Sequence, residues 1–91
     1  MKRVEIIASE SLQSEVLEAI AKVLPKLEYS LIPSVQGVGR RSRKEGTNVW
    51  PEENFVLFSY LEADDAALLR GAVESVKARF PDEGISCFEL G

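Results

Sequence analysis

The 91-residue chain contains no histidine and only one cysteine, Cys87. The missing imidazole groups remove the commonest ligands of zinc, copper and non-haem iron, and a lone cysteine cannot form a disulfide within the chain. Acid–base catalysis by histidine is excluded for the same reason. Cys87 lies between Ser86 and Phe88, and no basic residue that could activate its sulfur is readable beside it. We therefore expect a buried, inert thiol.

Long hydrophobic runs are also missing. No segment approaches the roughly 18 consecutive apolar residues that a membrane-spanning helix needs. The N-terminal Met1-Lys2-Arg3 precedes a short apolar run that Glu5 interrupts, so no signal peptide is readable and we expect a cytoplasmic protein. A net charge of −4 argues against a surface devoted to nucleic-acid phosphates. The chain is long enough for one compact domain and too short for two, so we predict a single soluble domain over residues 1–91.

The apolar pattern predicts six elements in the order strand, helix, strand, strand, helix, strand. β-Branched and aromatic residues cluster or alternate in the four predicted strands, at residues 3–9, 29–35, 55–61 and 85–90. This order is typical of an α+β, ferredoxin-like βαββαβ fold, in which two helices cover one face of a four-stranded antiparallel sheet. Because Pro33 has no amide hydrogen, its strand is predicted to lie at an edge or to contain a bulge.

Two helices fit the apolar residues that recur every three or four positions. The first is predicted to start at a cap on Ser9 or Ser11 and to end before Pro25. The second is predicted to start at a cap on Asp64 or Asp65 and to end before Pro81. Its apolar stripe comprises Leu68, Leu69, Ala72, Val73, Val76 and Phe80.

The third predicted strand is apolar on both faces. Phe55, Leu57 and Leu61 share one face, and Val56, Phe58 and Tyr60 share the other. The helices of this fold cover only one face of the sheet, so the second face needs another partner. Self-association is the simplest cover, and a bound ligand is the alternative.

Residues 36–54 lose this periodicity and are predicted to form one extended loop. A connection of this length without its own structure is usually functional. The segment holds four of the eleven basic residues, beside two glycines that let backbone amides approach a ligand. Guanidinium groups pair well with phosphate or carboxylate, so anion binding is one interpretation and a solvated surface loop is the other. The four basic residues are Arg40, Arg41, Arg43 and Lys44.

The turn Gly37-Val38-Gly39-Arg40, which closes the second strand before the long loop, resembles the nitrogen-regulatory PII and PII-like signalling proteins. The resemblance implies a homotrimer that binds nucleotide or another small anion in the clefts between subunits. It places ligand contacts at Gly37, Val38, Gly39, Arg40, Arg41, Gly84 and Ile85, and contacts to a regulated protein partner at Arg43, Lys44 and Trp50. Residues 80–85 depart from the family's phosphate-binding pattern, which implies a PII-like variant with a ligand other than ATP, or with none.

Two other functions stay open at this point. The segment Phe55-Val56-Leu57-Phe58 resembles part of the aromatic RNP1 segment of RNA-recognition motifs, although the preceding glutamates would repel phosphate. The divalent-cation-tolerance proteins, which share the trimeric fold, suggest a metal-binding protein. No catalytic set and no metal-ligand set is identified in the sequence, so we expect a protein that is not an enzyme.

Overall fold

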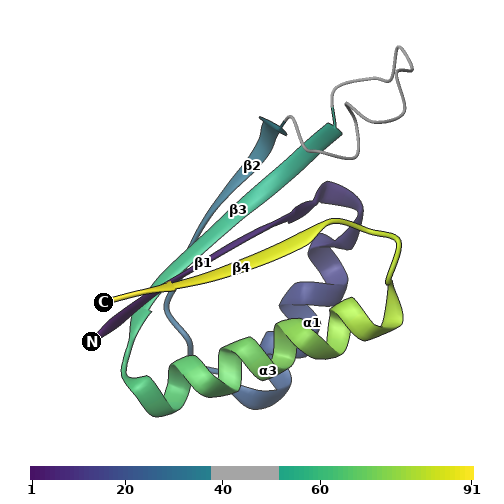
Figure 1. Ribbon diagram of the computed structural model, residues 1–91. Helices are drawn as coiled ribbons and strands as arrows, with labels where there is room; N and C mark the ends of the chain where they lie inside the picture. Colours follow the sequence, from purple (N-terminus) through teal and green to yellow (C-terminus); the bar gives the residue numbers. More distant parts are fainter. Residues whose placement is uncertain (38–51) are drawn as a thin grey trace.

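A computed structural model describes residues 1–37 and 52–91 of the chain. The elements follow the predicted order (Figure 1). They are β1 (Lys2–Ser9), the 3₁₀ turn η1 (Glu10–Leu12), α1 (Gln13–Val23), β2 (Ser30–Gly37), β3 (Glu52–Leu61), α3 (Ala63–Arg79) and β4 (Ile85–Leu90). Within the described ranges, no helix is long and apolar enough to cross a membrane.

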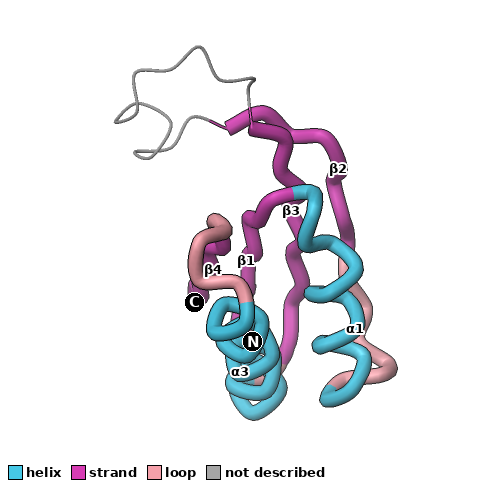
Figure 2. The backbone as a smooth tube through the Cα atoms, turned by 90° about the vertical axis from the view of Figure 1, so that its right-hand side faces the viewer, coloured by secondary structure: helices cyan, strands magenta, loops and turns pink. Residues whose placement is uncertain are grey.

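The strands form one sheet in the order β2-β3-β1-β4, and every neighbouring pair is antiparallel. Helices α1 and α3 lie together on one face of this sheet (Figure 2). The predicted ferredoxin-like α+β fold is therefore confirmed. In this order β1 and β3 are central, while β2 and β4 form the two edges.

The hydrophobic core lies between the helices and the inner face of the sheet. Alternate residues of β1 and β3 point into it, because successive side chains of a strand face opposite sides. The predicted inner face of the third strand is confirmed, since Phe55, Leu57 and Leu61 are buried. The other buried apolar residues are Val4, Ile6, Ala8, Leu12, Val16, Ile20, Ala66, Leu69, Ala72, Val73, Val76 and Ile85.

Strand pairing extends further than apolar periodicity predicts. Gln36 and Gly37 belong to β2, where they pair with Glu53 and Glu52 of β3. The predicted loop 36–54 is therefore too long at both ends. The error has a physical cause: backbone N–H and C=O groups pair across strands whatever the side chains are, so polar residues can extend a ladder. The remainder of that loop, residues 38–51, lies outside the described residues.

The irregularity predicted at Pro33 is confirmed. The register between β2 and β3 shifts between Ile32 and Val35, and β2 is an edge strand. Ser34 takes a left-handed backbone conformation with φ of 55°. A proline has no donor for the ladder, so the chain absorbs it in a bulge at the margin of the sheet.

The helix starts differ from the predicted caps. Glu62 is the N-cap of α3. Asp64 and Asp65 lie in the first turn of α3, where the positive end of the helix dipole stabilises their negative charge. At the first helix, Ser9 is the N-cap of η1, which leads directly into α1, but its hydroxyl makes no capping bond and lies 3.0 Å from that of Ser11. The helix ends are as predicted, with C-caps at the residues before Pro25 and Pro81.

Leu68 and Leu69 give a matched test of the core. Leu69 is fully buried, whereas Leu68, which the sequence also assigned to the apolar stripe, is 47% exposed. We expect Leu69→Ala to lower the free energy of unfolding by about 2–5 kcal/mol, because it leaves a cavity between α3 and the sheet. Leu68→Ala should change it by about 0.5 kcal/mol or less. Urea unfolding at one protein concentration measures both, and equal losses would contradict the assigned helix face.

Candidate functional site

The predicted ligand-binding residues that the structure describes lie at one end of the sheet. β2 ends there at Gly37, and β4 begins there at Ile85, directly after Gly84. The strand order places them on opposite edges, with β3 and β1 between them. Neighbouring strands are about 4.8 Å apart, so roughly 14 Å separates the two edges. A single chain therefore does not bring Gly37 and Gly84 together.

Gly37 is packed against a side chain that the sequence analysis did not single out. A Cβ atom built on Gly37 would lie 2.5 Å from Nδ2 of Asn54, which is closer than real contacts allow. The Asn54 amide therefore occupies the space beside Gly37. Asn54 pairs across the sheet with Val35, two residues before Gly37. Gly37 itself pairs with Glu52, so no pairing pattern in the sequence pointed to this contact. Asn54 adds an amide group, with two hydrogen-bond donors and an acceptor, three residues after segment 38–51.

At the other edge, Gly84 is held against the end of β1. The backbone N–H of Ser9 donates to the carbonyl of Gly84 at 3.2 Å. Among the residues that the structure describes, and apart from its chain neighbours, no atom lies within 4 Å of a Cβ built on Gly84, so this position is open. The side chain of Ile85 is buried in the core, which leaves its backbone as the part that can meet a ligand.

The remaining predicted contacts lie outside the described residues. They are Val38, Gly39, Arg40, Arg41, Arg43, Lys44 and Trp50, and their roles stay predictions.

The outer face of the sheet is apolar, and within residues 1–37 and 52–91 no element covers it. Its members come from all four strands: Arg3 of β1 pairs with Leu90 of β4 and with Tyr60 of β3, and Val56 of β3 pairs with Ile32 of β2. The large apolar side chains most exposed on this face are Ile32 at 48%, Tyr60 at 58%, Phe88 at 50% and Leu90 at 51%. We call the surface that these four residues mark the open face.

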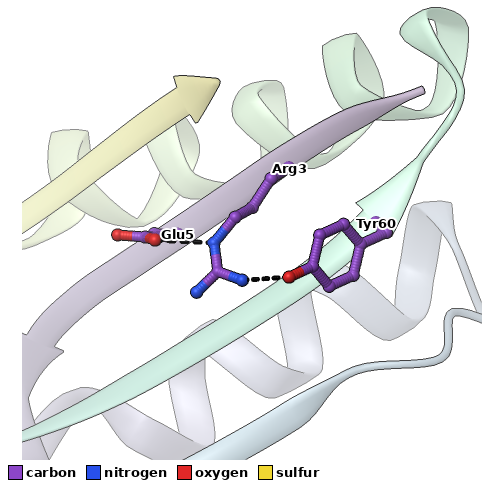
Figure 3. A network of polar contacts seen from close by, with 3 residues as sticks. All are labelled: Arg3, Glu5 and Tyr60. Atoms are coloured by element: carbon purple, nitrogen blue, oxygen red, sulfur yellow. Dashed lines mark hydrogen bonds and ion pairs between the residues drawn. The ribbon is translucent and has the colours of Figure 1, made fainter. Parts of the chain in front are cut away.

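One polar network crosses this face (Figure 3). Nε of Arg3 donates to Oε2 of Glu5 at 2.7 Å, and the guanidinium also donates to the Tyr60 hydroxyl. The guanidinium carbon lies 4.5 Å from the centre of the Phe58 ring and 5.2 Å from that of Tyr60. The bond to Glu5 is the largest cause of the raised pKa of Arg3. The two central charges of the face, Arg3 and Glu5, are thus paired with each other, and the Arg3 guanidinium also stacks on aromatic rings.

The RNP1-like segment divides between two environments. Phe55 and Leu57 are fully buried in the core, so of its four residues only Val56 and Phe58 lie on the outer face. Stacking of bases needs exposed rings on that face. The segment itself therefore supplies one ring, Phe58, for such contacts.

Cys87 is half-buried, not fully buried as expected. Burial raises the pKa of its thiol, which keeps the sulfur protonated and weakly nucleophilic near neutral pH. In the described part of the chain, no three His, Cys, Asp or Glu side chains gather in a way that would hold a metal ion.

The fold is an α+β, ferredoxin-like architecture that is also found in PII-like signalling proteins. A PII-like signalling protein of Thermus thermophilus superposes with a TM-score of 0.65 and 19% identity, covering 97% of this chain and 82% of that one. CPII of Thiomonas intermedia, in a structure bound to ADP and bicarbonate, superposes with a TM-score of 0.70 and 13% identity, covering 97% and 81%.

A second CPII structure, bound to ADP, AMP and bicarbonate, gives a TM-score of 0.68 at 12% identity, covering 97% of this chain and 81% of that one. No protein-family profile and no curated protein matches the chain. The resemblance inferred from Gly37 to Arg40 is therefore confirmed at the level of the fold.

The contact between Gly37 and Asn54 can be tested by a double-mutant cycle. Gly37→Ala puts a methyl group where the Asn54 amide lies, so that side chain must turn away. We expect a loss of unfolding free energy that Asn54→Ala largely removes, with a coupling of at least about 0.5 kcal/mol. Gly84→Ala is the control, because its new methyl group meets nothing, and it should not couple to Asn54→Ala. Additive effects of Gly37→Ala and Asn54→Ala would contradict the contact.

Proposed function

We propose that this chain is a PII-like regulatory protein that assembles as a homotrimer in the cytoplasm. In this proposal a small anion, with nucleotides as the first class to test, binds in the clefts between subunits, and segment 37–54 contacts a regulated partner protein. The role is regulatory and not enzymatic. Support at the level of fold comes from PII-like signalling proteins, of which CPII has been seen with ADP, AMP and bicarbonate.

The position of the two predicted ligand segments carries the proposal. Gly37 and Gly84 lie at the same end of the sheet but at opposite edges, across two intervening strands. If each chain places its β2 edge next to the β4 edge of a neighbour, Gly37 of one subunit meets Gly84 of the next. Arg40 and Arg41, a few residues beyond Gly37, would then supply positive charge to the same cleft.

The uncovered sheet face supplies the driving force for assembly. Ile32, Tyr60, Phe88 and Leu90 are large apolar side chains left about half in water. Burial of such side chains releases about 25 cal/mol for each Å² of apolar surface, and contiguous apolar patches of this kind mark association surfaces. Arg3 does not oppose burial as a free charge would, because Glu5 and Tyr60 already accept its hydrogen bonds.

Assembly through this face predicts different effects for two equally exposed residues. Phe88 on the open face is 50% exposed, and Leu68 on the outer side of α3 is 47% exposed. Phe88→Asp puts a charge into the proposed interface, so we expect a single chain by light scattering after size-exclusion chromatography. Wild-type protein and Leu68→Asp should both have the mass of three chains. A wild-type monomer, or a trimer that survives Phe88→Asp, would overturn this mode of assembly.

Ligand binding should depend on that assembly. We expect ADP, with and without bicarbonate, to raise the thermal stability of the wild-type protein, by about 2.7 kcal/mol at a hundred times the dissociation constant. The Phe88→Asp variant should lose the shift, because each cleft needs two subunits, and Leu68→Asp should keep it. Stabilisation of a monomeric variant would place the site within one chain, and a trimer unaffected by ADP would remove nucleotides as the ligand class.

A further inference from the structure

A pocket of about 450 Å³ lies at the end of the sheet opposite to Gly37 and Gly84. It is formed between the turn that follows α1 and the junction of β3 with α3. Both of these segments lie at the lower edge of the molecule in Figure 1. Its lining includes Leu24, Leu27 and Leu61, which pack on the hydrophobic core or belong to it. Its size is in the range of small-molecule sites, about 300–1,000 Å³. We call it the basal pocket.

Hydrogen bonds fix the wall of the basal pocket. The backbone N–H of Leu27 donates to the carbonyl of Leu24 at 3.1 Å, which shapes the turn after α1. The hydroxyl of Ser59 donates to the carbonyl of Glu28 at 2.6 Å. Ser59 is a buried polar residue, at 2% exposure, so this bond anchors Glu28 near the C-terminal end of β3. The pocket is thus formed before any ligand arrives, which lowers the cost of binding.

The rim of the basal pocket is acidic. Glu28, Glu62 and Asp65 line it, and the positive groups of its lining residues are the Lys26 ammonium and the N-terminal ammonium of Met1. Glu62 is the N-cap of α3, but its side chain makes no capping hydrogen bond. Among the described residues, none of the three carboxylates is held in an ion pair. Three unpaired carboxylates at the mouth of an apolar hollow favour a ligand with positive charge.

Aromatic rings adjoin the same carboxylates. Glu28 and Tyr60 line the basal pocket and also a neighbouring hollow of about 340 Å³ that includes Phe58. The rings of Phe58 and Tyr60 already hold one cation, the guanidinium of Arg3, at 4.5 and 5.2 Å from their centres. Tyr60 is therefore a wall residue of both hollows as well as a stacking partner of Arg3.

From these features we propose that the basal pocket binds a small organic cation, with an ammonium group next to Glu28 and Tyr60 and an apolar body against Leu24, Leu27 and Leu61. The site is complete within one chain. It therefore goes beyond the anion-binding function proposed above and does not depend on nucleotide binding.

Phenethylamine and its neutral counterpart phenethyl alcohol test the charge requirement directly. We expect phenethylamine, titrated into ¹⁵N-labelled full-length protein, to give saturable shifts in the amide signals of residues 24, 26–28 and 60–65. The alcohol should bind at least about tenfold more weakly, because it lacks the charge that the three carboxylates attract.

Matched variants separate the site from general surface charge. Glu28→Gln should weaken phenethylamine binding about tenfold and leave binding of the alcohol unchanged. Glu18→Gln makes the same change of charge on the exposed surface of α1, outside the pocket, and should have no effect. Equal affinity for amine and alcohol, equal effects of the two variants, or no saturable shift at millimolar probe would each overturn the proposal. Because the readout is local and uses no nucleotide, it is unaffected if ADP fails to bind.

Discussion

The whole structure depends on the burial of a single apolar layer between the sheet and the pair α1 and α3. β1 and β3 supply its floor with side chains such as Val4, Ile6, Phe55 and Leu57, all fully removed from water. Because successive strand residues face opposite sides, the same two strands must present their other residues on the outer face. When the inner face is built from these two strands, their alternate residues, which include Phe58 and Tyr60, must lie on the outer face. The proposed assembly buries that outer face.

The two ends of the sheet carry different chemistry. At one end, Gly37, Asn54 and Gly84 offer small side chains, an amide and exposed backbone, next to a segment rich in arginine. At the other end, Glu28, Glu62 and Asp65 surround an apolar hollow. The chain as a whole is acidic, with a net charge of −4, and at the second end three of its carboxylates border the apolar hollow. The proposed anion site and the proposed cation site thus lie at opposite ends of one small fold.

Local physics made most of the fold predictable from sequence. Alternation of apolar residues identified the strands, and prolines after Leu24 and Phe80 marked the helix ends. Three features were not predictable in this way. Polar residues extended β2 and β3 through backbone pairing, Glu62 took the cap position that the aspartates were expected to fill, and Leu68 turned outward. Each depends on tertiary pairing or packing, which a one-dimensional pattern does not contain. The candidate sites were harder to predict than the fold, because the Asn54 contact and the basal pocket each bring together residues that are distant in sequence.

The bulge at Pro33 and Ser34 makes the two margins of the sheet unequal. An edge strand offers unpaired N–H and C=O groups to any other strand, and regular edges are the usual route to uncontrolled lateral polymerisation. β2 is protected because the irregularity breaks the regular spacing of its outer hydrogen-bonding groups. β4 has no such interruption in its pairing with β1 and keeps a regular outer rim. The proline near the middle of β2 thus makes β4 the edge with the more regular row of hydrogen-bonding groups, where an added strand pairs in register more readily.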